Sequence, residues 1–212
     1  MIEFFFDCSS PWTYLAFHNI QPLAEEFDVD IEWRPMLVGG IFNTVNKTMY
    51  ETRANPVPAK QAYGAKDLQD WARVAGITIK MPPSVFPVNA VKSMRGCCWV
   101  QRENAELLVP FATAVFESYW GDDQDISQDA VLTKICERVG IDPAAFFAGI
   151  GEQPIKDQLK ANTDEAIARG AFGSPTIYLD KTDMYFGNDR LPLVFDALAR
   201  KNADAEAVIA RI

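Results

Sequence analysis

The segment from Ser10 to Thr13 (Ser-Pro-Trp-Thr) is the part of the chain whose residue types and position favour chemistry most. It follows the apolar run Ile2 to Phe6 and precedes an apolar-periodic stretch, which predicts a strand, a tight turn and a helix N-terminus. The free N–H groups and the macrodipole at a helix N-terminus stabilise a thiolate. Hydroxyls stand where a pair of reactive cysteines would lie, so the turn predicts a place for a thiolate that a ligand brings.

The Ser174-Pro175 bond is the second candidate. It follows small, flexible residues and precedes an apolar run, and a proline in that place favours a cis peptide. Such a bond leaves the N–H and C=O of Ser174 free to pair with an extended peptide ligand. The alternative is an ordinary trans proline that begins a strand.

Two polar segments complete the candidate ligand site. Asn55 offers a donor and an acceptor, and Lys60 can neutralise a ligand carboxylate, although this segment also fits a polar turn before a helix. Asn188 and Asp189 precede the last helix, where an acidic side chain can bind an ammonium group and free N–H groups suit a carboxylate. The alternative for this pair is a helix cap.

A cation for an anionic substrate remains open among Arg34, Arg53 and Lys60. Arg34 has a second interpretation, in which it ties loops together. Asn89 is a further polar candidate for the same cleft. We expect aromatic residues of the middle of the chain to supply the substrate pocket: Trp71, Phe86, Trp99, Phe111 and Trp120.

The elements that position these residues follow from apolar periodicity. A buried strand (2–6), a helix (11–27) and a period-two strand (28–34) predict a β-α-β unit with parallel strands. The polar stretch 36–58 predicts a long loop. Helices are expected at about 59–75, 87–104, 105–120, 128–139 with Ser127 as cap, 143–150 and 154–169, then an antiparallel hairpin (176–179 and 184–186) and a helix from about 191 to 200.

This order of elements predicts an α/β protein, a thioredoxin-like fold interrupted by a large all-helical insertion domain. We assign residues 1–40 to the first part of the thioredoxin-like domain, 41–153 to the insertion and 154–212 to the second part. A chain of 212 residues can bury such a core.

Composition excludes several other classes of protein. The net charge is −9 and the 20 Lys and Arg are scattered, so no basic surface for nucleic acid is expected. No run approaches the length of a membrane span, and no secretory signal is recognisable, which favours a cytoplasmic protein. The four cysteines lack Cys-x-x-Cys spacing and are expected to be buried or free thiols. A single histidine, His18, makes a metal site unpromising.

Four segments in matching order carry a resemblance: F-D-x-x-S-P-x-x-Y-L at 6–15, N-P-V-P-A-K at 55–60, G-A-F-G-S-P-T at 170–176 and F-G-N-D-R-L at 186–191. Together they resemble the 2-hydroxychromene-2-carboxylate isomerases, bacterial relatives of kappa-class glutathione transferases. The resemblance spans nearly the whole chain. It implies a glutathione-dependent cis-trans isomerase that forms trans-o-hydroxybenzylidenepyruvate in naphthalene-type catabolism, with a small aromatic carboxylate as substrate, and a homodimer.

The resemblance also implies a role for each residue. Ser10 would hydrogen-bond the glutathione sulfur, and Asn55 and Lys60 would contact the glycyl end. Ser174, before a cis Pro175, would pair with the cysteinyl backbone, and Asn188 with Asp189 would hold the γ-glutamyl group. Relatives often carry serine where this chain has Asn188. We interpret Cys8 as a packing residue, because it lies outside the helix N-terminus.

Three other functions stay open. A kappa-type transferase would release the adduct of glutathione with another aromatic electrophile. A dithiol-disulfide oxidoreductase would share the fold, but Ser10 and Thr13 cannot form a mixed disulfide. A glutathione-binding module would keep the cis-proline platform without chemistry.

Overall fold

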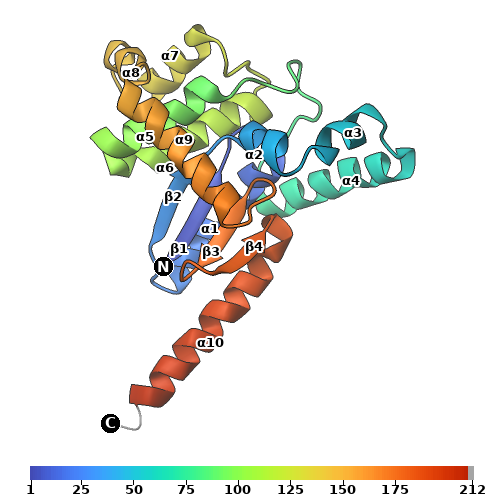
Figure 1. Ribbon diagram of the computed structural model, residues 1–212, viewed down its shortest axis with the longest axis vertical. Coiled ribbons are helices and arrows are strands. Elements are labelled where there is room, and N and C mark those ends of the chain that lie inside the picture. The colour runs from blue at the N-terminus through green and yellow to red at the C-terminus, as the bar shows by residue number, and fades with distance from the viewer. Residues whose placement is uncertain (210–212) are drawn as a thin grey trace.

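The structure, a computed structural model, describes residues 1–209 of the chain, with side chains up to Ala203. One sheet has the strand order β2-β1-β3-β4. β1 pairs in parallel with β2 and antiparallel with β3, and β3 pairs antiparallel with β4. The strands are β1 (Ile2–Phe6), β2 (Ile31–Pro35), β3 (Thr176–Leu179) and β4 (Asp183–Phe186). The first and last parts of the chain thus meet in one sheet (Figure 1).

The described helices lie on both sides of this sheet and beyond its end (Figure 1). α9 crosses one face, α1 packs on the other, and α10 extends away from the body. The α-helices are α1 (Pro11–Glu26), α2 (Val38–Thr44), α3 (Thr48–Ala54), α4 (Pro58–Ala75), α5 (Val91–Glu103), α6 (Leu108–Phe116), α7 (Asp129–Arg138), α8 (Pro143–Gly149), α9 (Gln153–Ala168) and α10 (Leu191–Ile209). Shorter turns are the 3-10 helices η1 (Ala105–Leu107) and η3 (Asn188–Arg190) and the π-helical η2 (Glu117–Gly121).

The central strand β1 is buried along its whole length. Successive side chains of a strand point to opposite faces of the sheet. Phe4 and Phe6 therefore enter the large core with Phe17 of α1, whereas Phe5 enters a small core with Tyr178 of β3. A strand buried on both faces is what the continuous apolar run predicts, and the structure confirms it.

The predicted order of elements is confirmed: β-α-β, a mostly helical stretch, then α-β-β-α with an antiparallel hairpin. The domain limits 1–40, 41–153 and 154–212 stay a prediction, and residues 210–212 of the third part lie outside the described residues. The last helix continues past the expected end at Arg200, to Ile209.

The long loop expected at 36–58 is wrong, because α2 and α3 occupy most of it. Ile41 and Phe42 of α2 are buried, and α2 packs against α9. Gly40 allows this approach, since a Cβ there would lie 3.0 Å from Cγ2 of Thr163. Tertiary packing forms α2 although its sequence, with two glycines, is a poor helix former.

Three helix limits also differ from the expectation. The helix predicted at 87–104 begins only at Val91, after an irregular segment. The helix predicted at 105–120 is divided into η1, α6 and η2. Ser127 does not cap α7, whose N-cap is Gln128 without a side-chain cap bond.

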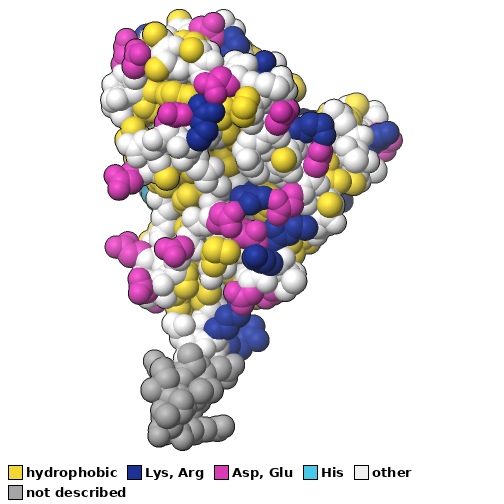
Figure 2. Space-filling model, turned by 60° about the vertical axis from the view of Figure 1, so that its left-hand side comes forward, with side chains coloured by type: hydrophobic (Ala, Val, Ile, Leu, Met, Phe, Trp, Pro, Cys, Tyr) yellow, Lys and Arg dark blue, Asp and Glu magenta, His cyan; other side chains and the backbone are white. Residues whose placement is uncertain are grey.

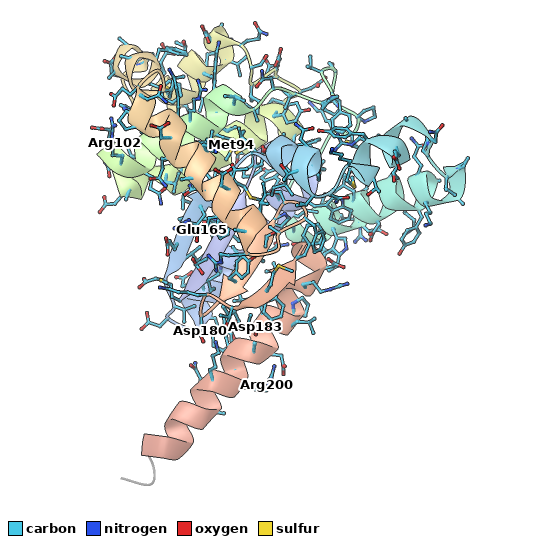
Figure 3. All side chains as sticks on the ribbon, in the orientation of Figure 1. Met94, Arg102, Glu165, Asp180, Asp183 and Arg200 are labelled. Carbon is cyan, nitrogen blue, oxygen red and sulfur yellow. The ribbon has the colours of Figure 1, made fainter. Side chains whose placement is uncertain are left out.

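A buried ion pair links β1 to the end of α9. Glu3 is 4% exposed, and its two carboxylate oxygens accept hydrogen bonds from Arg169 at 2.9 and 2.6 Å. Arg169 also pairs with Glu165, which Figure 3 labels on α9, and lies 3.9 Å from the ring centroid of Tyr178. The hydrogen bond from Arg169 lowers the pKa of Glu3, against the opposing effect of burial. The pair fixes α9 on the sheet.

We expect Arg169→Met to lower the free energy of unfolding by about 3 kcal/mol, because Glu3 then stays buried without its partner. Chemical denaturation measures the change. Arg200→Met is the matched control, since it removes an exposed pair with Asp196 and is expected to cost less than about 1 kcal/mol. Equal losses in both variants would contradict this role of the pair.

The same pair predicts a pH dependence of stability. The pKa of Glu3 in the folded protein lies below its ordinary value of 4.5, so the ionised pair stabilises the fold above that pH and loses this effect as the pH falls. We compare the melting temperature of the wild type with that of the Glu3→Gln, Arg169→Met double variant. The difference between the two, wild type minus variant, should therefore decrease as the pH falls into the acid range. A difference that stays constant from pH 7 down to about 3 would contradict the prediction.

Candidate active site

A cavity of about 620 Å³ lies where the N-terminus of α1, the α2–α3 segment and the segment before β3 meet. A loop from the middle of the chain closes it, with Met81 and Phe86 to Val91 in its wall. Its size suits a small organic ligand. The cavity brings together Ser10 and Ser174, which are 164 residues apart in the sequence.

Ser10 is the N-cap of α1, as the sequence predicts. Its backbone is extended, its Oγ accepts the N–H of Thr13 at 3.2 Å, and Pro11 takes the first helical position. The same Oγ donates to the carbonyl oxygen of Ser174 at 3.2 Å. The hydroxyl thus lies at the positive end of a 16-residue helix and in the wall of the cavity.

Ser174 is joined to the turn after β1 by three hydrogen bonds. Besides the bond from Ser10, its Oγ accepts the N–H of Asp7 at 3.0 Å and pairs with Oγ1 of Thr13 at 2.8 Å. The Ser174-Pro175 peptide is cis, which confirms that prediction. Pro175 itself is not among the described residues of the cavity wall.

Asp7 is a part of the site that belongs to the motif at 6–15 but to which sequence reasoning assigned no role. It is buried in the cavity wall, where Oδ1 accepts the N–H of Ser9 at 2.9 Å and Oδ2 accepts the N–H of Val38 at 2.8 Å. Burial raises the pKa of Asp7, and the two backbone donors oppose that shift. The carboxylate ties the turn before α1 to the N-terminus of α2. An acidic residue directly after a buried strand is the signal that could have found it.

The cavity wall includes several aromatic side chains. Of the five aromatic residues expected at a substrate pocket, Phe86 alone lies in the described wall. Phe111 and Trp120 are fully buried in the core, and Trp71 and Trp99 pack against it. The other aromatic residues of the wall come from α1, α2, α3, the segment before β3, and β4: Trp12, Phe42, Tyr50, Phe172 and Phe186.

The structure distinguishes the three candidate cations. Arg53, in the last turn of α3, and the polar candidate Asn89 line the cavity. Arg34 does not: it pairs with Glu32 and Glu165 next to a second hollow of about 360 Å³ between β2, α5 and α9. Arg34 therefore ties β2 to α9, and not loops to one another as the alternative interpretation expected.

Asn55 and Lys60 lie just beyond Arg53. Asn55 is the C-cap of α3, and Lys60 is in the first turn of α4. Both are exposed, and the described wall of the cavity does not include them. Their roles in ligand binding stay predictions.

Asn188 and Asp189 lie in the 3-10 turn that precedes α10, and the described cavity wall does not include them. Asn188 is 1% exposed, and its Oδ1 accepts a hydrogen bond from Asn19 of α1 at 2.9 Å, while its Nδ2 is buried without a partner. Asp189 is about half exposed and pairs with Arg190. The pair therefore lies beside α1, and its ligand role also stays a prediction.

The cysteines offer no sulfur to the cavity. Cys8, Cys97, Cys98 and Cys136 are buried and free, as expected. Burial raises the pKa of Cys8 well above its ordinary value, and the backbone N–H of this residue donates to Sδ of Met94, which Figure 3 labels. An inert, packed thiol is what the sequence predicted for Cys8.

Other kinds of site find no support within residues 1–209. His18 is exposed on α1, and the described side chains include no group of three His, Cys, Asp or Glu suited to a metal ion. Figure 2 shows Lys and Arg mixed with Asp and Glu on the face in view, rather than one basic patch. None of the described helices has the length and apolar character needed to cross a bilayer.

Comparison with known proteins finds relatives that match nearly the whole chain. The chain is 29% identical over 208 residues to 2-hydroxychromene-2-carboxylate isomerase of Pseudomonas putida, covering 96% of this chain and 98% of that protein. It is 27% identical over 210 residues to human glutathione S-transferase kappa 1, covering 94% and 92% of the two chains.

A solved structure of 2-hydroxychromene-2-carboxylate isomerase superposes with a TM-score of 0.79 at 26% identity, over 96% of this chain and 98% of that one. A sequence model of the DSBA-like thioredoxin domain matches residues 1–199. With the sheet order and the Ser10 turn described above, this match shows that the chain belongs to the DSBA-like thioredoxin domain family.

Proposed function

We propose that this protein is a glutathione-dependent cis-trans isomerase that converts 2-hydroxychromene-2-carboxylate to trans-o-hydroxybenzylidenepyruvate in naphthalene-type catabolism. The observation that supports it best is the position of the Ser10 hydroxyl, at the N-cap of α1 and in the wall of a cavity. The names of the relatives, an isomerase and kappa-class transferases, support the same reaction class.

The donors around the turn fit glutathione. A peptide ligand needs backbone partners, and among the described residues the carbonyl oxygen of Ser174 accepts a hydrogen bond from Ser10 alone, at 3.2 Å. A thiolate needs donors and a positive potential, which Ser10 and the N-terminus of α1 supply. The cavity of about 620 Å³ leaves room for a second small molecule beside the sulfur.

When bound, glutathione would supply a thiol whose anion adds to a conjugated double bond and is regenerated, which divides the isomerisation into easier steps. The hydroxyl of Ser10 can turn from the Ser174 carbonyl to donate to that sulfur, and the macrodipole of α1 favours its negative charge. Phe86 and Phe172 offer apolar surface for an aromatic substrate. Asp7 accepts hydrogen bonds from the turn and from the start of α2, which holds the two segments together and keeps the hydroxyl of Ser10 in place.

The remaining predicted residues would bind the three parts of glutathione. Asn55 and Lys60 would contact the glycyl end of glutathione, Ser174 before Pro175 the cysteinyl backbone, and Asn188 with Asp189 the γ-glutamyl group. We also propose that the enzyme is a cytoplasmic homodimer, on the resemblance and on its four free cysteines.

A kappa-type glutathione transferase is the second candidate. It is favoured by the human relative and uses the same thiolate and the same aromatic cavity. The two reactions differ in the fate of the adduct between glutathione and substrate. The isomerase eliminates glutathione from the adduct, whereas the transferase releases the whole adduct as a conjugate.

Incubation with glutathione and 2-hydroxychromene-2-carboxylate should give catalytic equilibration with trans-o-hydroxybenzylidenepyruvate, without consumption of glutathione. Ultraviolet spectroscopy monitors the interconversion, and a thiol assay measures the glutathione. A conjugate and stoichiometric loss of glutathione would support the transferase. Robust reduction of insulin would overturn the proposal in favour of a dithiol-disulfide oxidoreductase.

We expect Ser10→Ala to lower kcat by about 10-fold to 100-fold, because losing one hydroxyl donor raises the pKa of the bound thiol by about one or two units. Ultraviolet titration of the thiolate at saturating glutathione measures this pKa directly. An unshifted thiol pKa in the wild type would instead indicate a glutathione-binding module without chemistry.

Ser10→Ala also removes a helix cap, which costs about 1 kcal/mol of stability. Asp142→Ala is the matched control, since Asp142 caps α8 through the N–H groups of Ala144 and Ala145, outside the described cavity wall. The Asp142→Ala variant should lose about as much stability as Ser10→Ala, while its kcat and the pKa of the bound thiol stay at the wild-type values. A kcat that falls equally in both variants would assign the effect of Ser10 to stability alone.

A further inference from the structure

The charge of the cavity wall is unevenly placed. Of the described residues in the wall, Arg53 alone carries a positive charge and Asp7 alone a negative one. Asp7 is buried, and each of its carboxylate oxygens already accepts a backbone N–H. Arg53 is therefore the charged group that faces a ligand in this cavity without a bound counter-charge.

Two aromatic rings hold the Arg53 guanidinium in the wall. Its Cζ lies 5.5 Å from the ring centroid of Phe42 and 5.6 Å from that of Phe86. Contacts of this kind engage the flat face of a guanidinium and leave its N–H edge open to acceptors. The ion pairs among the described side chains, which extend to Ala203, do not include Arg53.

An edge of this kind matches a carboxylate. Arginine presents its N–H groups in a planar fork that binds both oxygens of a carboxylate at once. A chain with a net charge of −9 repels an anion at long range, so a carboxylate in the cavity needs a local cation. Phe86, which contacts Arg53, is 39% exposed and offers its ring surface beside that cation.

We propose that Arg53 binds the carboxylate of the aromatic substrate and selects anionic over neutral aromatic compounds. This inference rests on the proposed function and adds a specificity-determining residue to it. Ser10, at the N-terminus of α1, would donate a hydrogen bond to the sulfur of glutathione. Arg53, in the last turn of α3, would bind the carboxylate of the substrate.

The first arm of the test measures substrate kinetics. Arg53→Gln should raise the KM for 2-hydroxychromene-2-carboxylate by about 10-fold to 100-fold, the loss expected for a charge-assisted bidentate bond. Its kcat and the Kd of glutathione should change little, and Arg53→Lys should recover part of the KM. Arg73→Gln is the matched control, because Arg73 is exposed on α4, outside the described wall, and should leave KM unchanged.

The second arm needs no turnover, so it separates this inference from the proposed reaction. Calorimetric titration compares trans-cinnamate with its methyl ester in the presence of glutathione. The wild type should prefer the carboxylate, and Arg53→Gln should lose that preference while it binds the ester as before. If the wild type fails to isomerise yet shows this pattern, the proposed reaction fails and the role of Arg53 stands.

Three results would overturn the role of Arg53. The wild type could bind cinnamate no better than its ester, or Arg53→Gln could keep the preference for the carboxylate. The Kd of glutathione could also rise in Arg53→Gln by the same factor as the KM of the substrate, which would assign Arg53 to glutathione instead. Circular dichroism of each variant checks that the fold is retained.

Discussion

The contact between Ser174 and the turn after β1 is the interaction on which the site depends. Ser174 accepts hydrogen bonds from the N–H of Asp7 and the hydroxyl of Ser10, and its own hydroxyl pairs with that of Thr13. Three positions between the end of β1 and the first turn of α1 thus contact one residue from the far end of the chain. Buried polar groups that lose such partners cost about 1 to 3 kcal/mol each. The sheet pairing of β1 with β3 brings these segments together, and the hydrogen bonds fix their register.

Asp7 couples this turn to the helices of the middle segment. Through Ser9 and Val38 it spans the end of β1 and the start of α2, and α2 in turn packs on α9. The Glu3–Arg169 pair holds the C-terminal end of α9 on the sheet. Ser174 and the start of α2 are therefore both tied to the segment that follows β1, which gives the hydroxyl of Ser10 a defined position in the cavity wall.

Sequence periodicity was sufficient for the elements with strong patterns. The run Ile2 to Phe6 predicts a strand buried on both faces, and Ser10 with Pro11 predicts a capped helix, because these signals are local. It failed for α2, whose glycines contradict a helix and whose formation depends on contacts with α9. It also assigned no role to Asp7, because its partner Val38 lies 31 residues away in the sequence and meets it only in the folded chain.

The sequence by itself determined which groups the turn can offer: hydroxyls in place of cysteines at a helix N-terminus, a proline before the third strand, and no cysteine spacing for a disulfide exchange. Residue identity and local spacing carry that information. Only the tertiary structure decided which charged and aromatic groups share the cavity. It separated Arg53, in the wall, from Arg34, which is bound to Glu32 and Glu165, because the partners of a cation depend on contacts between distant segments.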